Sequence, residues 1–247
     1  GSAGEGTWAQ VADGPNARDW HAMAPLSGGR VLMYGGLDAN NNYLNDTWIY
    51  TPSSSSTSSN GKGGSGGGGT WAQVADGPGA RLYHAMAPLS GGRVLMYGGY
   101  DGSNDFNDAH IYTPSSTSTS SNGKGGRGRG GTWTQVADGP SGRAYHAMAP
   151  LSEGRVLMYG GWDGNNALND AYIYTPSSTS VSSNGKGGSA GEGTWTQVAD
   201  GPGARSYHAM APLSDGRVLM YGGVSNNNYL NDAYIYTPSS TSTSSNG

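Results

Sequence analysis

The sequence contains no cysteine and little charge. Without cysteine, the chain has no disulfide bond, no thiolate metal ligand and no cysteine nucleophile. Charged residues make up 12% of its 247 residues, and the formal net charge is -4. Binding of nucleic acid through phosphate neutralisation depends on a broad basic field, which this composition does not supply. We therefore expect no nucleic-acid partner.

Long apolar runs are also missing. A membrane-spanning helix needs about 20 consecutive apolar residues, whereas the apolar residues here occur in short runs such as the one within residues 30–34. No charged and then apolar leader precedes the first repeat. We expect no membrane insertion, and the lack of cysteine does not by itself decide the compartment.

What the sequence has in abundance is repetition. Glycine accounts for 45 residues, and serine and threonine are dense between short apolar segments. A Thr-Trp pair marks four copies of one unit, and the spacing between successive copies is 62 or 63 residues. The tryptophans of these pairs are Trp8, Trp71, Trp133 and Trp195. Such a period indicates an array of equivalent structural units.

Each unit contains four segments with the pattern of a β-strand. In the last full unit they are residues 194–198, 207–211, 217–223 and 232–237. All four are short and rich in β-branched or aromatic residues, and glycine, proline, asparagine and aspartate separate them. The sequence therefore predicts an all-β chain with four strands in each unit.

The order of motifs within a unit resembles the kelch repeat. The motifs are Arg-Ser-Tyr-His at 205–208, Val-Leu-Met-Tyr-Gly-Gly at 218–223, Leu-Asn-Asp-Ala-Tyr-Ile-Tyr at 230–236, and the Thr-Trp pair at Trp195. The resemblance covers about three quarters of the chain and implies a β-propeller of four kelch-like, four-stranded blades. We place the blades at about 19–76, 82–138, 144–200, and 206–238 together with 7–13.

The repeats are longer than an ordinary kelch unit of about 50 residues. The surplus lies in Ser/Thr/Gly inserts at 53–70, 115–132 and 177–194, and in a split insert formed by 239–247 with 1–6. One interpretation is a flexible linker. The other is a long hairpin that extends the third and fourth strands, because Asn184-Gly185 is a preferred hairpin turn.

The start of the chain matches the end of an insert. Residues 1–8 repeat the sequence of residues 188–195, so the chain breaks within an insert. We expect the segment around Trp8 to complete the last blade and close the ring, since closure removes exposed sheet edges. A ring of eight blades from two chains and a fragment of a longer array are the alternatives.

Two sets of residues are candidates for ligand binding at the mouth of the propeller. By the resemblance, the segment that enters each blade lies on the same face as the loop after the Gly-Gly pair. An arginine in each entering segment would focus positive potential on an anionic ligand, unless a carboxylate or carbonyl groups hold it. The candidates are Arg18, Arg81, Arg143 and Arg205, with the aromatic residues Trp20, Tyr83, Tyr145 and Tyr207 that follow them.

The loop after the Gly-Gly pair is where the four copies differ most. These loops are residues 37–44, 100–106, 162–168 and 224–230. Tyr100 and Trp162 stand there beside asparagine and aspartate, a combination that suits a peptide or carbohydrate surface. Alternatively, the aromatic rings cover blade edges while the polar residues make turns.

No arrangement of residues in the sequence indicates catalysis. Kelch-containing oxidases of the galactose oxidase type use cysteine and tyrosine, and this chain has no cysteine. We expect no catalytic residue, no metal and no cofactor. The leading hypothesis is an extracellular or cell-surface binding or scaffolding module with a protein or glycan ligand, and a cytoplasmic location stays open.

Two alternative functions stay open. The first is a structural subunit that self-associates into a fibre or layer through its Ser/Thr/Gly arms. The second is a designed or recently amplified repeat protein that has no specific ligand.

Overall fold

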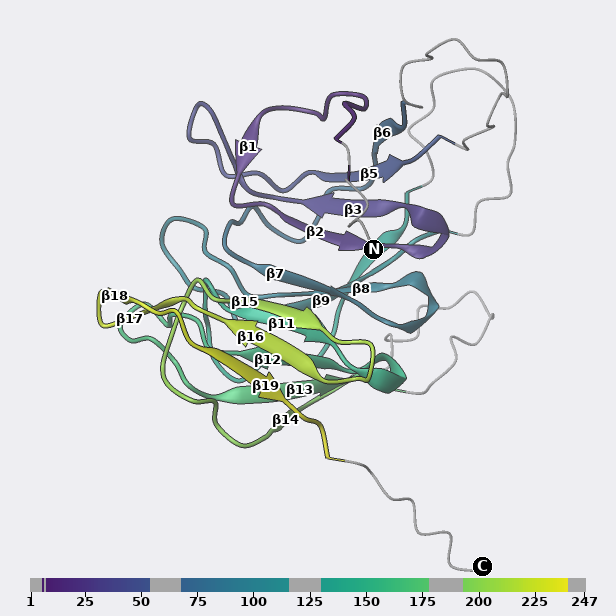
Figure 1. The fold of residues 1–247 in the computed structure, drawn as a ribbon. Coiled ribbons are helices and arrows are strands. Elements are labelled where there is room, and N and C mark those ends of the chain that lie inside the picture. The colour runs from purple at the N-terminus through teal and green to yellow at the C-terminus, as the bar shows by residue number, and fades with distance from the viewer. Residues whose placement is uncertain (1–5, 7, 54–67, 116–129, 178–192, 240–247) are drawn as a thin grey trace, which may run out of the picture.

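The computed structural model describes residues 6, 8–53, 68–115, 130–177 and 193–239. These residues form an all-β chain whose four main antiparallel sheets are the four blades of a β-propeller (Figure 1). The fold class predicted from the repeats is confirmed. No helix in the described part of the chain is long and apolar enough to cross a membrane.

The strands follow the same order in every blade. Blade 1 contains β2 (Ala22–Pro25), β3 (Val31–Tyr34), β5 (Thr47–Thr51) and β6 (Thr70–Gln73). Blade 2 contains β7 (Ala85–Pro88), β8 (Val94–Tyr97), β9 (Ala109–Thr113) and β10 (Thr132–Gln135). Blade 3 contains β11 (Ala147–Pro150), β12 (Val156–Tyr159), β13 (Ala171–Thr175) and β14 (Thr194–Gln197). Blade 4 contains β15 (Ala209–Pro212), β16 (Val218–Tyr221) and β19 (Ala233–Tyr236).

Shorter elements complete the described structure. Two small ribbons are formed by β1 (Arg18–Asp19) with β4 (Leu37–Asp38), and by β17 (Val224–Ser225) with β18 (Asn228–Tyr229). Turns of 3-10 helix join the first two strands in three blades: η1 (Ser27–Gly29), η2 (Ser90–Gly92) and η3 (Ser152–Gly154).

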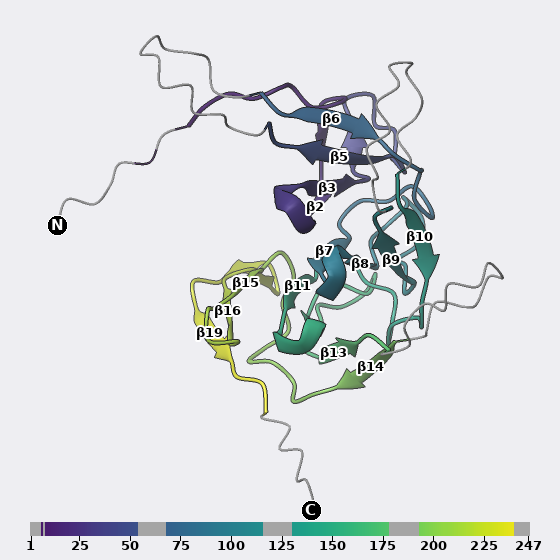
Figure 2. The same cartoon turned by 90° about the vertical axis from the view of Figure 1, so that its right-hand side faces the viewer.

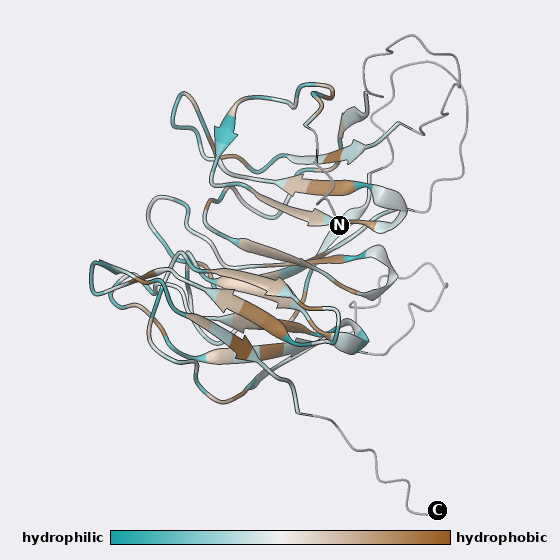
Figure 3. Cartoon of the chain, in the orientation of Figure 1, coloured by the Kyte–Doolittle hydropathy of each residue, from teal (hydrophilic) through white to brown (hydrophobic). Residues whose placement is uncertain are grey.

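The core of the molecule lies between the blades. Successive side chains of a strand point to opposite faces of its sheet, so in β8 Val94 and Met96 pack against blade 1, while Leu95 and Tyr97 pack against blade 3. All four side chains are buried. Figure 3 shows the apolar residues concentrated on the strands. Full burial of one such side chain contributes about 1.5–3 kcal/mol.

The tryptophan of each Thr-Trp pair joins neighbouring blades. Trp133 on β10 lies 5.1 Å from the ring of Tyr34 in blade 1, and its Nε1–H donates to Thr47 Oγ1 at 3.0 Å. Trp195 repeats the ring contact with Tyr97 at 4.9 Å. The repeated motif is thus a joint between consecutive blades.

The predicted completion of the last blade by residues 7–13 does not occur in the structure. Blade 4 has three strands, residues 8–13 of that segment pair with none of them, and Trp8 is fully exposed. The three joints between blades set an arc whose two ends, blades 1 and 4, lie apart (Figure 2). For this reason the segment that precedes β1 does not reach β19.

Most of the Ser/Thr/Gly inserts lie outside the described residues. These parts are residues 1–5, 54–67, 116–129, 178–192 and 240–247. The choice between a linker and an extended hairpin therefore stays a prediction.

Candidate functional site

One end of the blades carries the loops that differ most among the repeats. We call this end the loop face; it comprises residues 18–20, 81–83, 143–145 and 205–207 with the loops 37–44, 100–106, 162–168 and 224–230 (Figure 1, left). Short ladders tie the two kinds of segment together. Ala144 N–H donates to Trp162 C=O at 2.9 Å, and Trp162 N–H donates back at 2.8 Å. The loops are therefore held on a defined scaffold.

The Gly-Gly pair allows the two segments of the loop face to approach closely. Gly99 has a φ of +100°, in the region that favours glycine. A Cβ at this position would lie 2.8 Å from the carbonyl oxygen of Leu82 and 2.9 Å from Cβ of His84. The Gly99 N–H donates to the carbonyl of Arg143 at 2.9 Å, which connects blade 2 to blade 3.

The structure places the four candidate arginines inside the blades. Arg81 and Arg143 are 1% and 0% exposed. The guanidinium of Arg81 donates two hydrogen bonds to the carboxylate of Asp108, at 2.6 and 2.9 Å, and a third to Gly98 C=O at 2.9 Å. Arg18, Arg143 and Arg205 make the same paired contact with Asp46, Asp170 and Asp232.

The predicted ring of arginines around an anion is therefore not formed. A buried guanidinium needs a paired carboxylate, and the Asn-Asp sequence before each third strand supplies it. This signal was present in every repeat. Burial alone would raise the pKa of Asp108, but hydrogen bonds from Arg81 and His110 hold that pKa well below its usual range.

The histidine that follows each arginine is a packing residue. His84 is buried, and its ring lies 5.2 Å from the ring of Tyr34 in an edge-on contact. Burial, and next the charge of Arg81, lower the pKa of His84 to about 3. The imidazole is therefore neutral at neutral pH, between two blades.

The four aromatic candidates at the mouth form a stack along the arc. Their ring centroids are 4.8 Å apart for Trp20 and Tyr83, 4.0 Å for Tyr83 and Tyr145, and 4.1 Å for Tyr145 and Tyr207. All four have a positive φ, between +53° and +60°. A bulky residue in this conformation costs about 1–3 kcal/mol. No motif in the sequence indicates this strain.

A groove of about 530 Å³ lies on the loop face between blades 3 and 4. The structure brings three predicted residues together there: Tyr145, Trp162 and Tyr207. Amide side chains from the two adjoining loops complete the groove: Asn165, Asn166, Asn226 and Asn227.

Three further candidates lie elsewhere on the loop face, and one of them, Tyr83, stands in the stack between Trp20 and Tyr145. Tyr100 occupies the position of Trp162 on blade 2, where it is partly exposed and pairs with Leu82. Trp20 lines a separate hollow on blade 1. The groove between blades 3 and 4 therefore contains three of the six predicted aromatic residues.

The charge on the loop face is opposite to the one we predicted. The four variable loops contain four aspartates, Asp38, Asp101, Asp105 and Asp163, and neither lysine nor arginine. Burial raises the pKa of Asp105, and the nearby carboxylates of Asp163 and Asp101 raise it further. Because the arginines are neutralised below the surface, these carboxylates set the sign of the face.

Comparison with known proteins agrees with the repeat pattern. The family model described as the KLHDC2/KLHL20/DRC7 Kelch-repeats domain matches residues 5–180. Adagio-like protein 1 of Oryza sativa is 24% identical over 69% of this chain and 26% of its own length. The F-box/kelch-repeat protein At1g51550 of Arabidopsis thaliana is 25% identical over 85% of this chain and 43% of its own. Tip elongation aberrant protein 1 of Schizosaccharomyces pombe is 27% identical over 85% of this chain and 16% of its own. The chain spans less than half the length of these relatives.

Proposed function

Because the chain belongs to the kelch-repeat family, we propose that it is a non-catalytic protein-binding module whose ligand docks on the loop face. The observation that carries the proposal is the groove between blades 3 and 4. It combines exposed aromatic rings with amide side chains on loops that a rigid scaffold holds. Binding residues are often found on loops of this kind.

The lining of the groove favours an extended peptide. The rings of Trp162 and Tyr207 are 37% and 59% exposed, so both offer apolar surface to a ligand. The amides of Asn165 and Asn226 donate and accept hydrogen bonds, as a peptide backbone requires. Aromatic rings with a few polar groups are typical of a site for a partly apolar segment.

The carboxylates on the loop face favour a ligand that carries positive charge. Asp101, Asp105 and Asp163 lie on the loops of blades 2 and 3. Burial first, and next the charges of Asp163 and Asp101, raise the pKa of Asp105. A lysine or arginine in the ligand would relieve this repulsion. The ligand we propose is therefore a basic or neutral protein segment.

The same lining argues against catalysis at this place. Among the described residues that line the groove, none is a histidine, carboxylate, lysine or arginine. General acid-base catalysis requires a titratable group close to the substrate. Tyr145 and Tyr207 line the groove, but burial raises the pKa of both hydroxyls, so neither acts as a base at neutral pH. The buried histidines and arginines are committed to packing and to ion pairs.

A peptide array probed with the chain tests the proposal. We expect retained peptides to contain lysine or arginine beside apolar residues, and we expect Trp162→Ala and Tyr207→Ala to lose them. Tyr229→Ala is the matched control, because this exposed ring lies on the loop face outside the lining of the groove. Retention of the same peptides by Trp162→Ala would contradict the proposal.

A carbohydrate ligand is the second candidate, because stacking rings beside amides also suit a sugar. A glycan array in parallel discriminates the two: binding to glycans alone would replace the peptide by a sugar. An extracellular or cell-surface location stays a prediction. Self-assembly through the Ser/Thr/Gly arms also stays a prediction, because most of these arms lie outside the described residues. If the arms mediate assembly, deleting them should abolish it.

A further inference from the structure

The three joints between blades repeat one set of contacts. A tyrosine at the end of the second strand packs under a glycine of the segment that enters the next blade, in the pairs Tyr34 and Gly77, Tyr97 and Gly139, and Tyr159 and Gly201. Its hydroxyl donates to a carbonyl of the same segment: that of Gly79, Ser141 or Gly203. Every joint therefore needs an incoming chain against this tyrosine.

Blade 4 exposes the face that would make a fourth joint. Leu219, Tyr221 and Ile235 are 37%, 55% and 49% exposed. The matching residues of blade 3, Leu157, Tyr159 and Ile173, are 3%, 4% and 8% exposed because blade 4 covers them. Blade 1 is open at the opposite end of the arc, where Met23 is 48% exposed and its counterparts Met86 and Met148 are 9% exposed.

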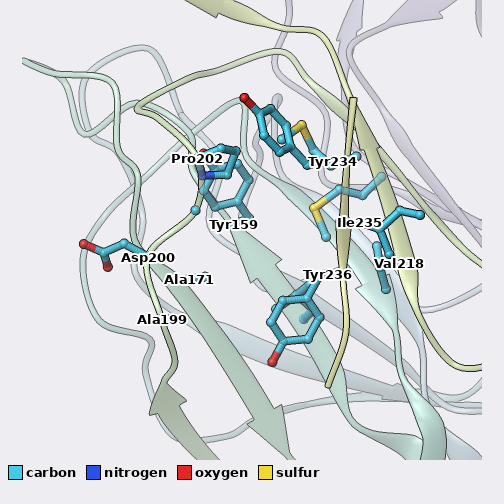
Figure 4. Close-up of a pocket in the computed structure, with 13 residues that line it drawn as sticks. Tyr159, Ala171, Ala199, Asp200, Pro202, Val218, Tyr234, Ile235 and Tyr236 are labelled. Carbon is cyan, nitrogen blue, oxygen red and sulfur yellow. The ribbon is translucent and has the colours of Figure 1, made fainter. Parts of the chain in front are cut away.

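A cavity of about 200 Å³ lies beside the outer strand of blade 4 (Figure 4). Tyr159, Tyr236 and Ala199 contribute to its lining. The residues at the same positions one blade earlier are Tyr97, Tyr174 and Ala137, and they surround Trp195. That indole lies 4.9 Å from Tyr97 and 5.1 Å from Tyr174, and its Nε1–H donates to Ala137 C=O at 3.1 Å. The cavity therefore repeats the surroundings of a joint tryptophan.

The outer edge of β19 matches the sequence at the start of the chain. In the other blades the third strand pairs with a Thr-Trp strand so that tyrosine lies opposite tryptophan, as in Tyr174 and Trp195. Residues 8–11, Trp-Ala-Gln-Val, are identical to residues 71–74, which begin with a joint tryptophan. Trp8 is fully exposed, so its ring is available to a cavity of this kind.

We propose that a second copy of the chain docks on blade 4, and that the exchange is reciprocal, so that each copy completes the last blade of the other. Residues 8–11 of that copy form the fourth strand beside β19, with Trp8 in the cavity opposite Tyr236. Gly14 and Trp71 of the same copy cover Tyr221, as Gly77 and Trp133 cover Tyr34.

The arc favours a second copy over the chain's own start. Within one chain, Trp8 and Tyr221 are both exposed, and the blades that carry the two surfaces lie at separate ends of the arc (Figure 2). If two copies exchange their amino-terminal segments, the segment of each copy completes blade 4 of the other. Both exposed surfaces are then covered in one symmetric dimer. This inference does not depend on the ligand of the loop face.

Sedimentation over a range of protein concentrations tests the proposal. We expect a dimer, and Trp8→Ala should weaken it on the order of 30-fold or more, as the loss of a buried anchor does. Because Trp8 is fully exposed in the single chain, this variant keeps its fold. Tyr221→Ala tests the opposite surface, and Gln135→Ala on the outer strand of blade 2 is the control that should leave the dimer intact.

Hydrogen exchange of residues 8–13 separates a second copy from closure within one chain. Protection that grows with protein concentration, and that Trp8→Ala abolishes, supports the proposal. A monomer with unprotected residues 8–13 overturns it. A monomer in which these residues are protected at every concentration also overturns it, in favour of closure by the chain's own segment.

Discussion

The indole of Trp195 lies 4.9 Å from the ring of Tyr97 in the preceding blade, while its Nε1–H donates to the carbonyl of Ala137 at 3.1 Å. One side chain of the outer strand thus contacts blade 2 through its ring and through its polar group. Because blades contact only their neighbours, such joints determine how the array holds together.

Replacing this tryptophan tests the joint. Trp195→Ala should lower the free energy of unfolding by about 3 kcal/mol, since a large, mostly buried ring leaves a cavity. Trp195→Phe, which keeps a ring but loses the hydrogen bond, should cost about 1 kcal/mol beyond its loss of volume. Urea unfolding followed by circular dichroism measures both. A loss below about 1 kcal/mol for the alanine variant would show that the joint is not important.

The Gly-Gly pair offers a matched comparison of two glycines. Gly99→Ala should cost about 3 kcal/mol or more, because the new Cβ would lie 2.8 Å from a backbone carbonyl oxygen at a φ of +100°. Gly91→Ala, at a φ of +74° with no atom within 4 Å of the Cβ, should cost only about 1 kcal/mol. Equal losses in thermal unfolding would contradict the close approach of the two loop-face segments.

The buried arginines are expected to affect stability and not ligand binding. Arg143→Met leaves the carboxylate of Asp170 without its partner and should cost about 3–5 kcal/mol. Arg143→Met with Asp170→Leu removes both charges and should recover part of this loss. Chemical denaturation of the single and double variants measures the coupling. If the effects of the two substitutions on the free energy of unfolding simply add, Arg143 does not form this ion pair.

Acid should destabilise the fold through its buried histidines. The unfolded chain takes up a proton on histidine near pH 6.5, whereas the pKa of His84 in the folded chain is about 3. The unfolded state therefore binds more protons between these values, and stability falls as the pH drops from 6.5 towards 3.

His84→Leu tests this pH dependence by removing one such proton difference. The fall in stability between pH 6.5 and pH 4 should become shallower, and unfolding curves measured across this range report the slope. Asp108, which is paired with Arg81, adds a further loss below about pH 4, because its pKa is lowered in the folded chain. An unchanged slope in His84→Leu would show that His84 is protonated in the folded chain.

Much of the fold could be predicted because its determinants are local. The alternation in Val-Leu-Met-Tyr specifies which side chains face each neighbour, and the recurring Thr-Trp pair marks the outer strand. Whether the first segment reaches the last blade depends instead on the summed rotation at three joints, which no local pattern encodes. For this reason Trp8 was expected in a strand and is exposed in the structure.

The candidate site was predictable only in part. Tyr145, Trp162 and Tyr207 were chosen for their residue type and position, and the structure places all three in one groove. For the arginines the sequence leaves two alternatives open, because the charge of a side chain does not say whether it points to solvent or to a buried aspartate. The positive φ of the mouth residues could not be predicted from their type, because bulky aromatic residues rarely adopt that conformation.

The carboxylates of the loop face should contribute to binding through charge. Asp105→Asn should weaken binding of a lysine- or arginine-containing peptide several-fold at low salt, and less at high salt, because salt screens exposed charges. Fluorescence polarisation with a labelled peptide from the array, at two salt concentrations, measures this. A salt-independent effect would point to a lost hydrogen bond instead of a lost charge.

The most direct test of the account is an affinity measurement on the groove between blades 3 and 4. Isothermal titration of an array-selected basic peptide should give saturable binding to the chain and to Tyr229→Ala. Binding should be at least about ten-fold weaker in Trp162→Ala and Tyr207→Ala, as expected for the loss of an aromatic anchor. Equal affinity in all four proteins would contradict a protein-binding groove on the loop face.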